Sequence, residues 1–74
     1  MIIKVKIKLK SGEMAGGKIN IGDNNRFTTF IELNKSIDHI PLFNATIGGV
    51  NGFFLIPKNN VSYYVPGDVE KGVE

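Results

Sequence analysis

The chain has 74 residues, no cysteine and a formal net charge of only +2. A chain of this length forms one small domain, and without cysteine it has neither a disulfide framework nor a thiolate zinc site. No apolar run approaches the roughly 20 residues that cross a bilayer, so we expect a cytoplasmic protein with no membrane partner. The first 18 residues hold five lysines and one glutamate, so the basic character is local.

The N-terminal segment alternates apolar and basic side chains. Branched apolar residues occupy the odd positions from 3 to 9, and lysines occupy the even ones, namely Lys4, Lys6, Lys8 and Lys10. This period predicts a strand with one buried face. The lysines could follow a phosphate backbone, or they could protect an exposed edge strand from aggregation. We favour edge protection because no aromatic residue is interleaved with the lysines, although Tyr63–Tyr64 could supply stacking from another strand.

The next segment returns after a turn at Ser11–Gly12–Glu13 and forms a second strand up to Gly22. Gly16–Gly17 inside that strand predicts a bulge or a barrel corner, which we favour over close approach of a ligand. Between residues 26 and 34 the apolar side chains fall near helical spacing. We therefore expect about two turns of helix, with its phenylalanine stripe facing the core.

The third strand is predicted over His39–Ile47. Its apolar alternation slips by one residue, which predicts a bulge near Phe43–Asn44. Pro41 cannot donate to a ladder and therefore predicts that this part of the strand lies at an edge.

The C-terminal half centres on two apolar segments joined by a polar turn. Phe53–Ile56 is a continuous apolar run, which predicts a strand covered on both faces. Val61–Val65 alternates like a strand with one buried face, and Pro66–Gly67 is expected to end it. We expect these two segments to pair with each other across the Asn59–Asn60 turn.

Together these signals predict an all-β fold with one short helix, a five-stranded, strongly bent antiparallel sheet that closes a small barrel. Residues 1–66 form this single domain, and residues 67–74 form a polar tail that is expected to fray.

Two segments resemble the motifs of Sm-like or Src-homology-type small barrels. The first motif is similar to Leu9-Lys10-Ser11-Gly12-Glu13 with Gly17-Lys18-Ile19-Asn20-Ile21-Gly22-Asp23, and the second to Ile56-Pro57-Lys58-Asn59-Asn60-Val61-Ser62-Tyr63. The resemblance implies an RNA pocket lined by Asp23, Asn25, Lys58 and Asn59, with Pro57-Lys58 in place of the family's Arg-Gly pair. The chain also resembles a small bacterial domain family of unknown function, through Gly17–Gly22, Arg26, Phe30, Ile40–Leu42 and Asn60–Pro66.

Catalytic chemistry has little basis in this sequence. His39 is the only histidine, and Asp38 beside it on an extended chain points away from it. We expect no enzyme activity, no cofactor and no metal site. The favoured function is a non-catalytic protein-binding or self-assembling scaffold module. We expect a homo-oligomer or an unknown protein partner, with an assembly surface formed by Phe53, Phe54, Leu55 and Tyr64. The alternative is an Sm-like homo-oligomeric ring that binds single-stranded RNA through the four lysines and the Lys58 loop.

Overall fold

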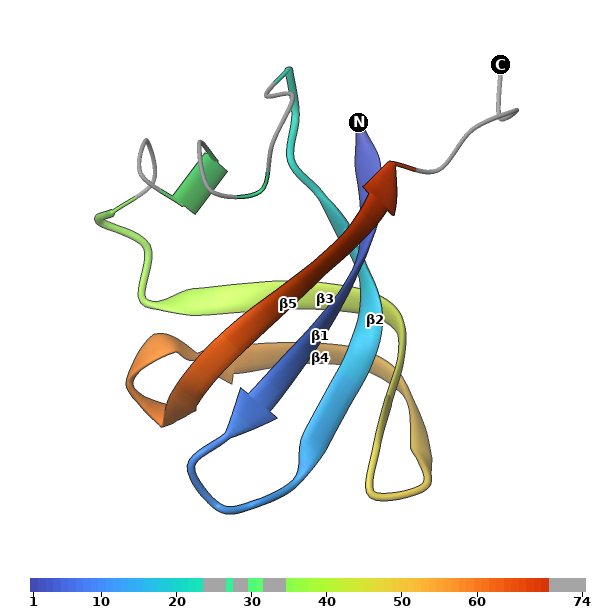
Figure 1. Cartoon of the computed structure of the whole chain (residues 1–74), viewed down its shortest axis with the longest axis vertical. Coiled ribbons are helices and arrows are strands. Elements are labelled where there is room, and N and C mark those ends of the chain that lie inside the picture. Colours follow the sequence, from blue (N-terminus) through green and yellow to red (C-terminus); the bar gives the residue numbers. More distant parts are fainter. Residues whose placement is uncertain (24–26, 28–29, 32–34, 70–74) are drawn as a thin grey trace.

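The computed structural model describes residues 1–23, 27, 30–31 and 35–69, and only the backbone of residues 68 and 69. Within these residues the chain forms five strands and one short 3-10 turn (Figure 1). Their bounds are β1 (Ile2–Leu9), β2 (Met14–Asn20), β3 (His39–Ile47), β4 (Val50–Pro57), η1 (Lys58–Asn60) and β5 (Val61–Val69).

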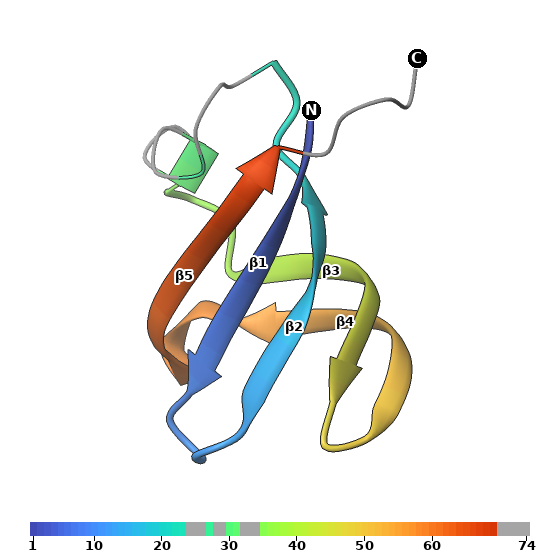
Figure 2. The same ribbon diagram turned by 45° about the vertical axis from the view of Figure 1, so that its right-hand side comes forward.

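All five strands belong to one antiparallel sheet in the order β4-β3-β2-β1-β5. The predicted five-stranded antiparallel sheet is therefore confirmed. The sheet is bent but open, because β4 and β5 lie at its two edges (Figure 2). The predicted pairing across the Asn59–Asn60 turn is wrong, since β4 pairs with β3 and β5 pairs with β1.

Two backbone hydrogen bonds explain why β4 and β5 separate. The Lys58 N–H donates to the Asp38 carbonyl oxygen at 2.8 Å, and the Lys10 N–H donates to the Asn60 carbonyl oxygen at 2.8 Å. The start of η1 is thus held at the entry to β3, whereas its end is held beside the exit from β1. Because the two ends of η1 have different partners, the chain crosses from one edge of the sheet to the other.

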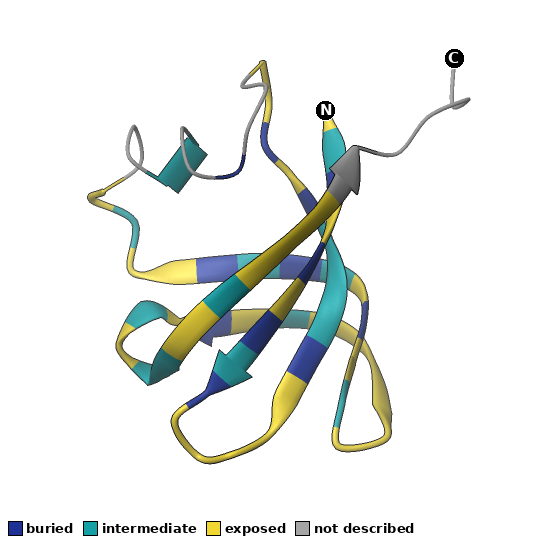
Figure 3. Cartoon of the chain, viewed as in Figure 1, coloured by how far each residue is buried: buried dark blue, intermediate teal, exposed yellow. Residues whose placement is uncertain are grey.

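The core is formed by alternate residues of the strands. Figure 3 shows buried and exposed residues alternating along β1, as the apolar–lysine pattern predicted. The buried hydrophobic residues are Ile3, Val5, Ile7, Leu9, Ala15, Ile19, Ile21, Phe27, Ile40, Leu42, Ala45 and Ile56. Full burial of a large aliphatic side chain is worth about 1.5–3 kcal/mol, so this cluster is the main source of the stability of the domain.

One bulge on β3 bends this part of the sheet, at the position predicted near Phe43–Asn44. The register of β2 against β3 shifts between Gly16 and Lys18, and that of β3 against β4 shifts between Leu42 and Ala45. Asn44 lies in this bulge with a φ of 47°, a left-handed conformation that asparagine tolerates better than most residues. In both ladders the extra residue is on β3, whereas β2 keeps a regular register with β1 through Gly16 and Gly17. The bulge predicted at Gly16–Gly17 is therefore on the facing strand.

Pro41 lies in the half of β3 that borders on β4 alone. The register of β2 against β3 runs from Ile47 to Phe43, whereas Pro41 is paired with Leu55 of β4. Among the described residues no other strand pairs with this half of β3, which agrees with the edge position predicted from Pro41.

The helix predicted between residues 26 and 34 lies mostly outside the described residues. Its described members Phe27, Phe30 and Ile31 have helical backbone. Phe27 is buried, and the other two pack against the core from a partly exposed position. The predicted orientation of the phenylalanine stripe toward the core is confirmed for these residues.

The last strand continues past Pro66–Gly67, so the prediction that these residues end it is wrong. The register of β5 against β1 pairs Pro66 with Val5 and Val69 with Ile3, which places one extra residue on β5. A Cβ on Gly67 would lie 3.0 Å from the Lys4 carbonyl oxygen. Glycine permits a bulge here where the turn chemistry suggested a strand end, and residues 70–74 of the predicted tail lie outside the described residues.

The close approach of β2 to β3 makes Gly17 sensitive to substitution. A Cβ at Gly17 would lie 2.5 Å from the Ala45 Cβ, whereas nothing lies within 4 Å of a Cβ at Gly16. We expect Gly17→Ala to destabilise the domain by about 1–3 kcal/mol, because overpacking a core has this typical cost. Thermal unfolding should show a Tm lower by roughly 4–8 °C for each kcal/mol.

The matched control is Gly16→Ala. It adds the same methyl group to the neighbouring strand residue, and alanine in a strand is favoured over glycine by about 0.5–1 kcal/mol. We expect its Tm to be unchanged or slightly higher. Equal losses in the two variants would contradict the packing described between Gly17 and Ala45.

Candidate functional site

The lysine-bearing strand β1 lies in the interior of the sheet. It pairs with β2 on one side and β5 on the other. Lys4 and Lys6 are exposed, and the half-buried Lys8 donates from Nζ to the Gly12 carbonyl oxygen at 2.9 Å. Lys10 is exposed and follows the end of the strand. The interpretation that the lysines protect an edge strand is therefore wrong, because the backbone of β1 is already paired on both sides.

The register of the strands brings three rows of side chains to the outer face of the sheet, which points away from the core. Lys8 lies between Met14 of β2 and Tyr63 of β5. Directly opposed residues point to the same face, with Cβ atoms about 4.5–5.5 Å apart. The other two rows are Val65–Lys6–Gly16 and Lys4–Lys18. We call this surface the lysine face; its residues are Lys4, Lys6, Lys8, Met14, Gly16, Lys18, Tyr63 and Val65.

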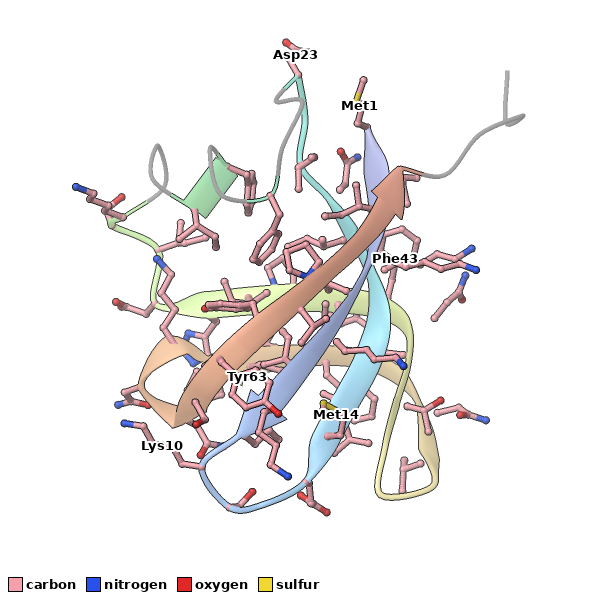
Figure 4. The ribbon with its side chains drawn as sticks, viewed as in Figure 1. Met1, Lys10, Met14, Asp23, Phe43 and Tyr63 are labelled. Carbon is pink, nitrogen blue, oxygen red and sulfur yellow. The ribbon has the colours of Figure 1, made fainter. Side chains whose placement is uncertain are left out.

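The apolar members of the lysine face are open to solvent. Tyr63 is 50% exposed, Val65 46% and Met14 42%. Figure 4 shows Tyr63 near the carboxyl end of β1 and Met14 on the neighbouring strand β2. Sequence reasoning did not assign Val65, Met14 or Lys18 to this surface. The alternation of Val61–Val65 indicated which side chains share a face, but nothing in it indicated that β5 pairs with β1.

The four residues of the predicted assembly surface do not lie on one face of the sheet. Phe53 and Leu55 are 64% and 58% exposed, whereas Phe54 and Tyr64 are half-buried against the core. One face of Phe53–Ile56 is covered by the core, as predicted, and the other is exposed in a single copy, so its predicted cover by something other than the core stays a prediction. The ring of Tyr64 instead packs on Phe27, with centroids 5.0 Å apart and planes tilted by 58°.

Phe53 and Leu55 belong to a wider apolar surface on β3 and β4. Leu55 is opposed by Pro41, and Phe43 is opposed by Lys18 of the lysine face. Pro41 and Phe43 are partly exposed. We call the four residues Pro41, Phe43, Phe53 and Leu55 the apolar patch. It adjoins the lysine face at the Lys18–Phe43 pair, so the two surfaces share the outer side of the sheet.

The residues of the implied RNA pocket come from separate places. Asp23 lies beyond β2, where the Ile21 N–H donates to the Met1 carbonyl oxygen at 2.8 Å. Lys58 and Asn59 lie in η1, at the opposite end of the sheet in both ribbon views (Figure 1, Figure 2). Asn25 is outside the described residues. A single copy of the chain therefore does not bring Asp23 together with the Lys58 loop.

His39 is exposed at the start of β3, as expected for a surface position. Within the part of the chain that the structure describes, no group of three or more His, Cys, Asp or Glu residues could hold a metal ion. Among the same residues, no helix is both long and apolar enough to span a bilayer.

Comparison with known proteins gives no relative. No family model matches the chain, and neither a curated protein nor a solved structure matches it. The resemblances to small Sm-like barrels and to a bacterial family therefore stay predictions.

Burial of Tyr64 has a consequence for its ionisation. Partial burial raises the pKa of the Tyr64 phenol above its ordinary value of about 10. In Tyr63→Phe, Tyr64 is the only tyrosine, and ultraviolet absorbance should show its ionisation midpoint above that of a free tyrosine. A midpoint at or below the free value would contradict the packing of Tyr64 on Phe27.

The same shift links folding to alkaline pH. Because the pKa of Tyr64 is higher in the folded chain than in the unfolded chain, its contribution to stability is present below about pH 10 and is lost as pH rises through the folded pKa. Tyr64→Phe cannot ionise there. We therefore expect the Tm of the parent chain to fall relative to that of Tyr64→Phe as the pH rises above 10.

Proposed function

We propose that the chain is a non-catalytic module that assembles with further copies of itself through its two edge strands. The proposal is supported by the position of β4 and β5 at opposite edges of an open sheet. An unpaired strand edge presents a row of N–H and C=O groups that can pair with another chain. The chain has one such edge on each side, so each copy can join two neighbours.

The observation that carries the proposal is the match between the exposed side chains of the two edges. On β4, Phe53 and Leu55 point outward from the core, and on β5, Tyr63 and Val65 point outward. If β4 of one copy pairs with β5 of another, the outer faces become continuous. Apolar side chains from both copies then meet across the seam, and each large side chain that leaves water contributes about 1.5–3 kcal/mol.

The sheet of one copy is open at β4 and β5. Because β4 and β5 differ in sequence, a contact between them joins two different surfaces. Such a heterologous contact closes a ring when its rotation permits and otherwise extends as a fibre. The alternative to a second copy is an unknown protein that pairs one of its own strands with the edge of β4 or β5.

Assembly should depend on the exposed residues of β4. At tens of micromolar, where a contact of micromolar affinity is populated, we expect the parent chain to be oligomeric by light scattering. The double variant Phe53→Ser with Leu55→Ser should be monomeric and should keep its Tm, because both side chains are exposed in one copy.

The matched control is Val50→Ser. Val50 is 61% exposed on the same strand but has the opposite parity from Phe53 and Leu55, so it does not lie on the outer face. We expect this variant to remain oligomeric. A monomeric parent chain at these concentrations would overturn the proposal.

A mixing experiment distinguishes pairing of unlike edges from pairing of like edges. A second double variant, Tyr63→Ser with Val65→Ser, removes the apolar side chains of β5 and should also be monomeric. If β4 pairs with β5, the two monomeric variants still hold one intact β4 and one intact β5 between them, and their mixture should form a heterodimer. A mixture that stays monomeric would contradict pairing between unlike edges.

A further inference from the structure

The lysine face concentrates positive charge on one side of the sheet. Among the pairs that the register gives for described side chains, its three rows contain Lys4, Lys6, Lys8 and Lys18 and no acidic residue, and Lys8 also donates to the Gly12 carbonyl oxygen. Lys4 is placed directly opposite Lys18, and like charges in directly opposed positions destabilise a sheet. Lys18 also has a further interaction of its own, so the inference relies on the three lysines of β1. These lysines are about 7 Å apart along the strand.

Gly16 leaves an opening in the middle of this surface. It is opposed by Lys6, and nothing lies within 4 Å of a Cβ built on it. Its neighbour Gly17 is required by the close contact with Ala45, but no such contact explains Gly16. A glycine inside a strand marks a bulge, a tight bend, or a place where a ligand or another backbone approaches closely, and the extra residue of the nearby bulge is on β3 rather than at Gly16. The opening beside Lys6 permits such an approach to the backbone of β2.

Tyr63 adds an exposed aromatic ring beside the lysines. It is directly opposite Lys8 and is 50% exposed, so part of its ring surface is available to a ligand. A row of cations next to an aromatic ring is the combination that binds single-stranded nucleic acid, because the cations contact phosphates and the ring stacks on a base.

We propose that the lysine face binds single-stranded nucleic acid, with Lys4, Lys6 and Lys8 contacting phosphates, Tyr63 stacking on a base and Gly16 admitting the chain. This site differs from the loop pocket implied by the Sm-like resemblance, because Lys58 and Asn59 do not belong to these rows. It lies within one copy of the chain. Binding therefore does not require the proposed assembly, and either proposal can fail alone.

The primary test measures binding of a fluorescein-labelled, mixed-sequence RNA of roughly 12 nucleotides, a length within the usual site size of such surfaces. Fluorescence anisotropy between about 50 and 200 mM salt should give a linear fall of log affinity with log salt, because bound lysines release counterions. Lys6→Gln should weaken binding about 5- to 10-fold at the lower salt and reduce the salt slope by about 0.7.

The matched control is Lys35→Gln. Lys35 is exposed in the turn before β3, outside the lysine face, and this variant has the same net charge as Lys6→Gln. We expect its affinity to stay close to that of the parent chain. Equal losses in the two variants would show that net charge alone attracts the RNA and would overturn the proposed site.

Two variants of Tyr63 separate stacking from assembly. Tyr63→Phe keeps an aromatic ring and should bind RNA like the parent chain. Tyr63→Leu keeps an apolar side chain at the edge of β5 but removes the ring, and should weaken binding about 5- to 150-fold without changing the oligomer mass. Equal affinity of the two variants would overturn the stacking role.

Gly16→Val tests the opening without changing charge, and we expect weaker RNA binding at an unchanged Tm. A second arm measures sedimentation of the parent chain with vesicles rich in anionic lipid. Vesicle binding with no RNA binding at low salt would overturn the proposal in favour of a lipid surface.

Discussion

The contact between Gly17 of β2 and Ala45 of β3 is the constraint on which the bent sheet depends. The two backbones approach so closely that an added Cβ at Gly17 would overlap the Ala45 side chain. The bulge between Leu42 and Ala45 lies at the same point. Because both strands change direction there, the β3–β4 half of the sheet folds against the half that holds β1, and one sheet encloses a core (Figure 2). A chain of 74 residues has a small stability margin, so it depends on this arrangement.

The structure also explains why the hairpin predicted across Asn59–Asn60 does not form. Two apolar segments on either side of Asn59–Asn60 have the sequence pattern of a hairpin. That pattern does not reveal the hydrogen bonds from the Lys58 N–H to the Asp38 carbonyl oxygen and from the Lys10 N–H to the Asn60 carbonyl oxygen, which hold the ends of η1 beside different strands. Both partners are remote in sequence from η1. The choice between a hairpin and a crossing therefore depends on tertiary contacts, and the result is an open sheet with β4 and β5 at its edges.

The sequence predicted the structural features that depend only on residues close together in the chain. Alternation identified the buried side of β1, and the slipped period located the bulge on β3, which lies opposite the glycine pair of β2. It did not predict cross-strand register, because alternation fixes which residues share a face but not which strand lies beside them. The candidate site shows the same limit. The lysines were evident from the sequence, but their relation to Tyr63 and Gly16 depends on the neighbours of β1, which only the folded chain defines.

The position of the two surfaces makes assembly and nucleic-acid binding compatible. Edge pairing uses the free N–H and C=O groups of β4 and β5, which lie in the plane of the sheet, whereas the lysine face points away from that plane. A continuous sheet would leave the lysines of β1 open and align them with those of the next copy, whereas Tyr63 lies at the seam and offers to a base only the part of its ring that the next copy leaves uncovered. Three lysines and one aromatic ring make a weak site in a single copy. Several such sites on one assembly act at a high effective concentration along the same strand of nucleic acid, so avidity can raise the overall affinity by about 10²–10⁴ without any new contact.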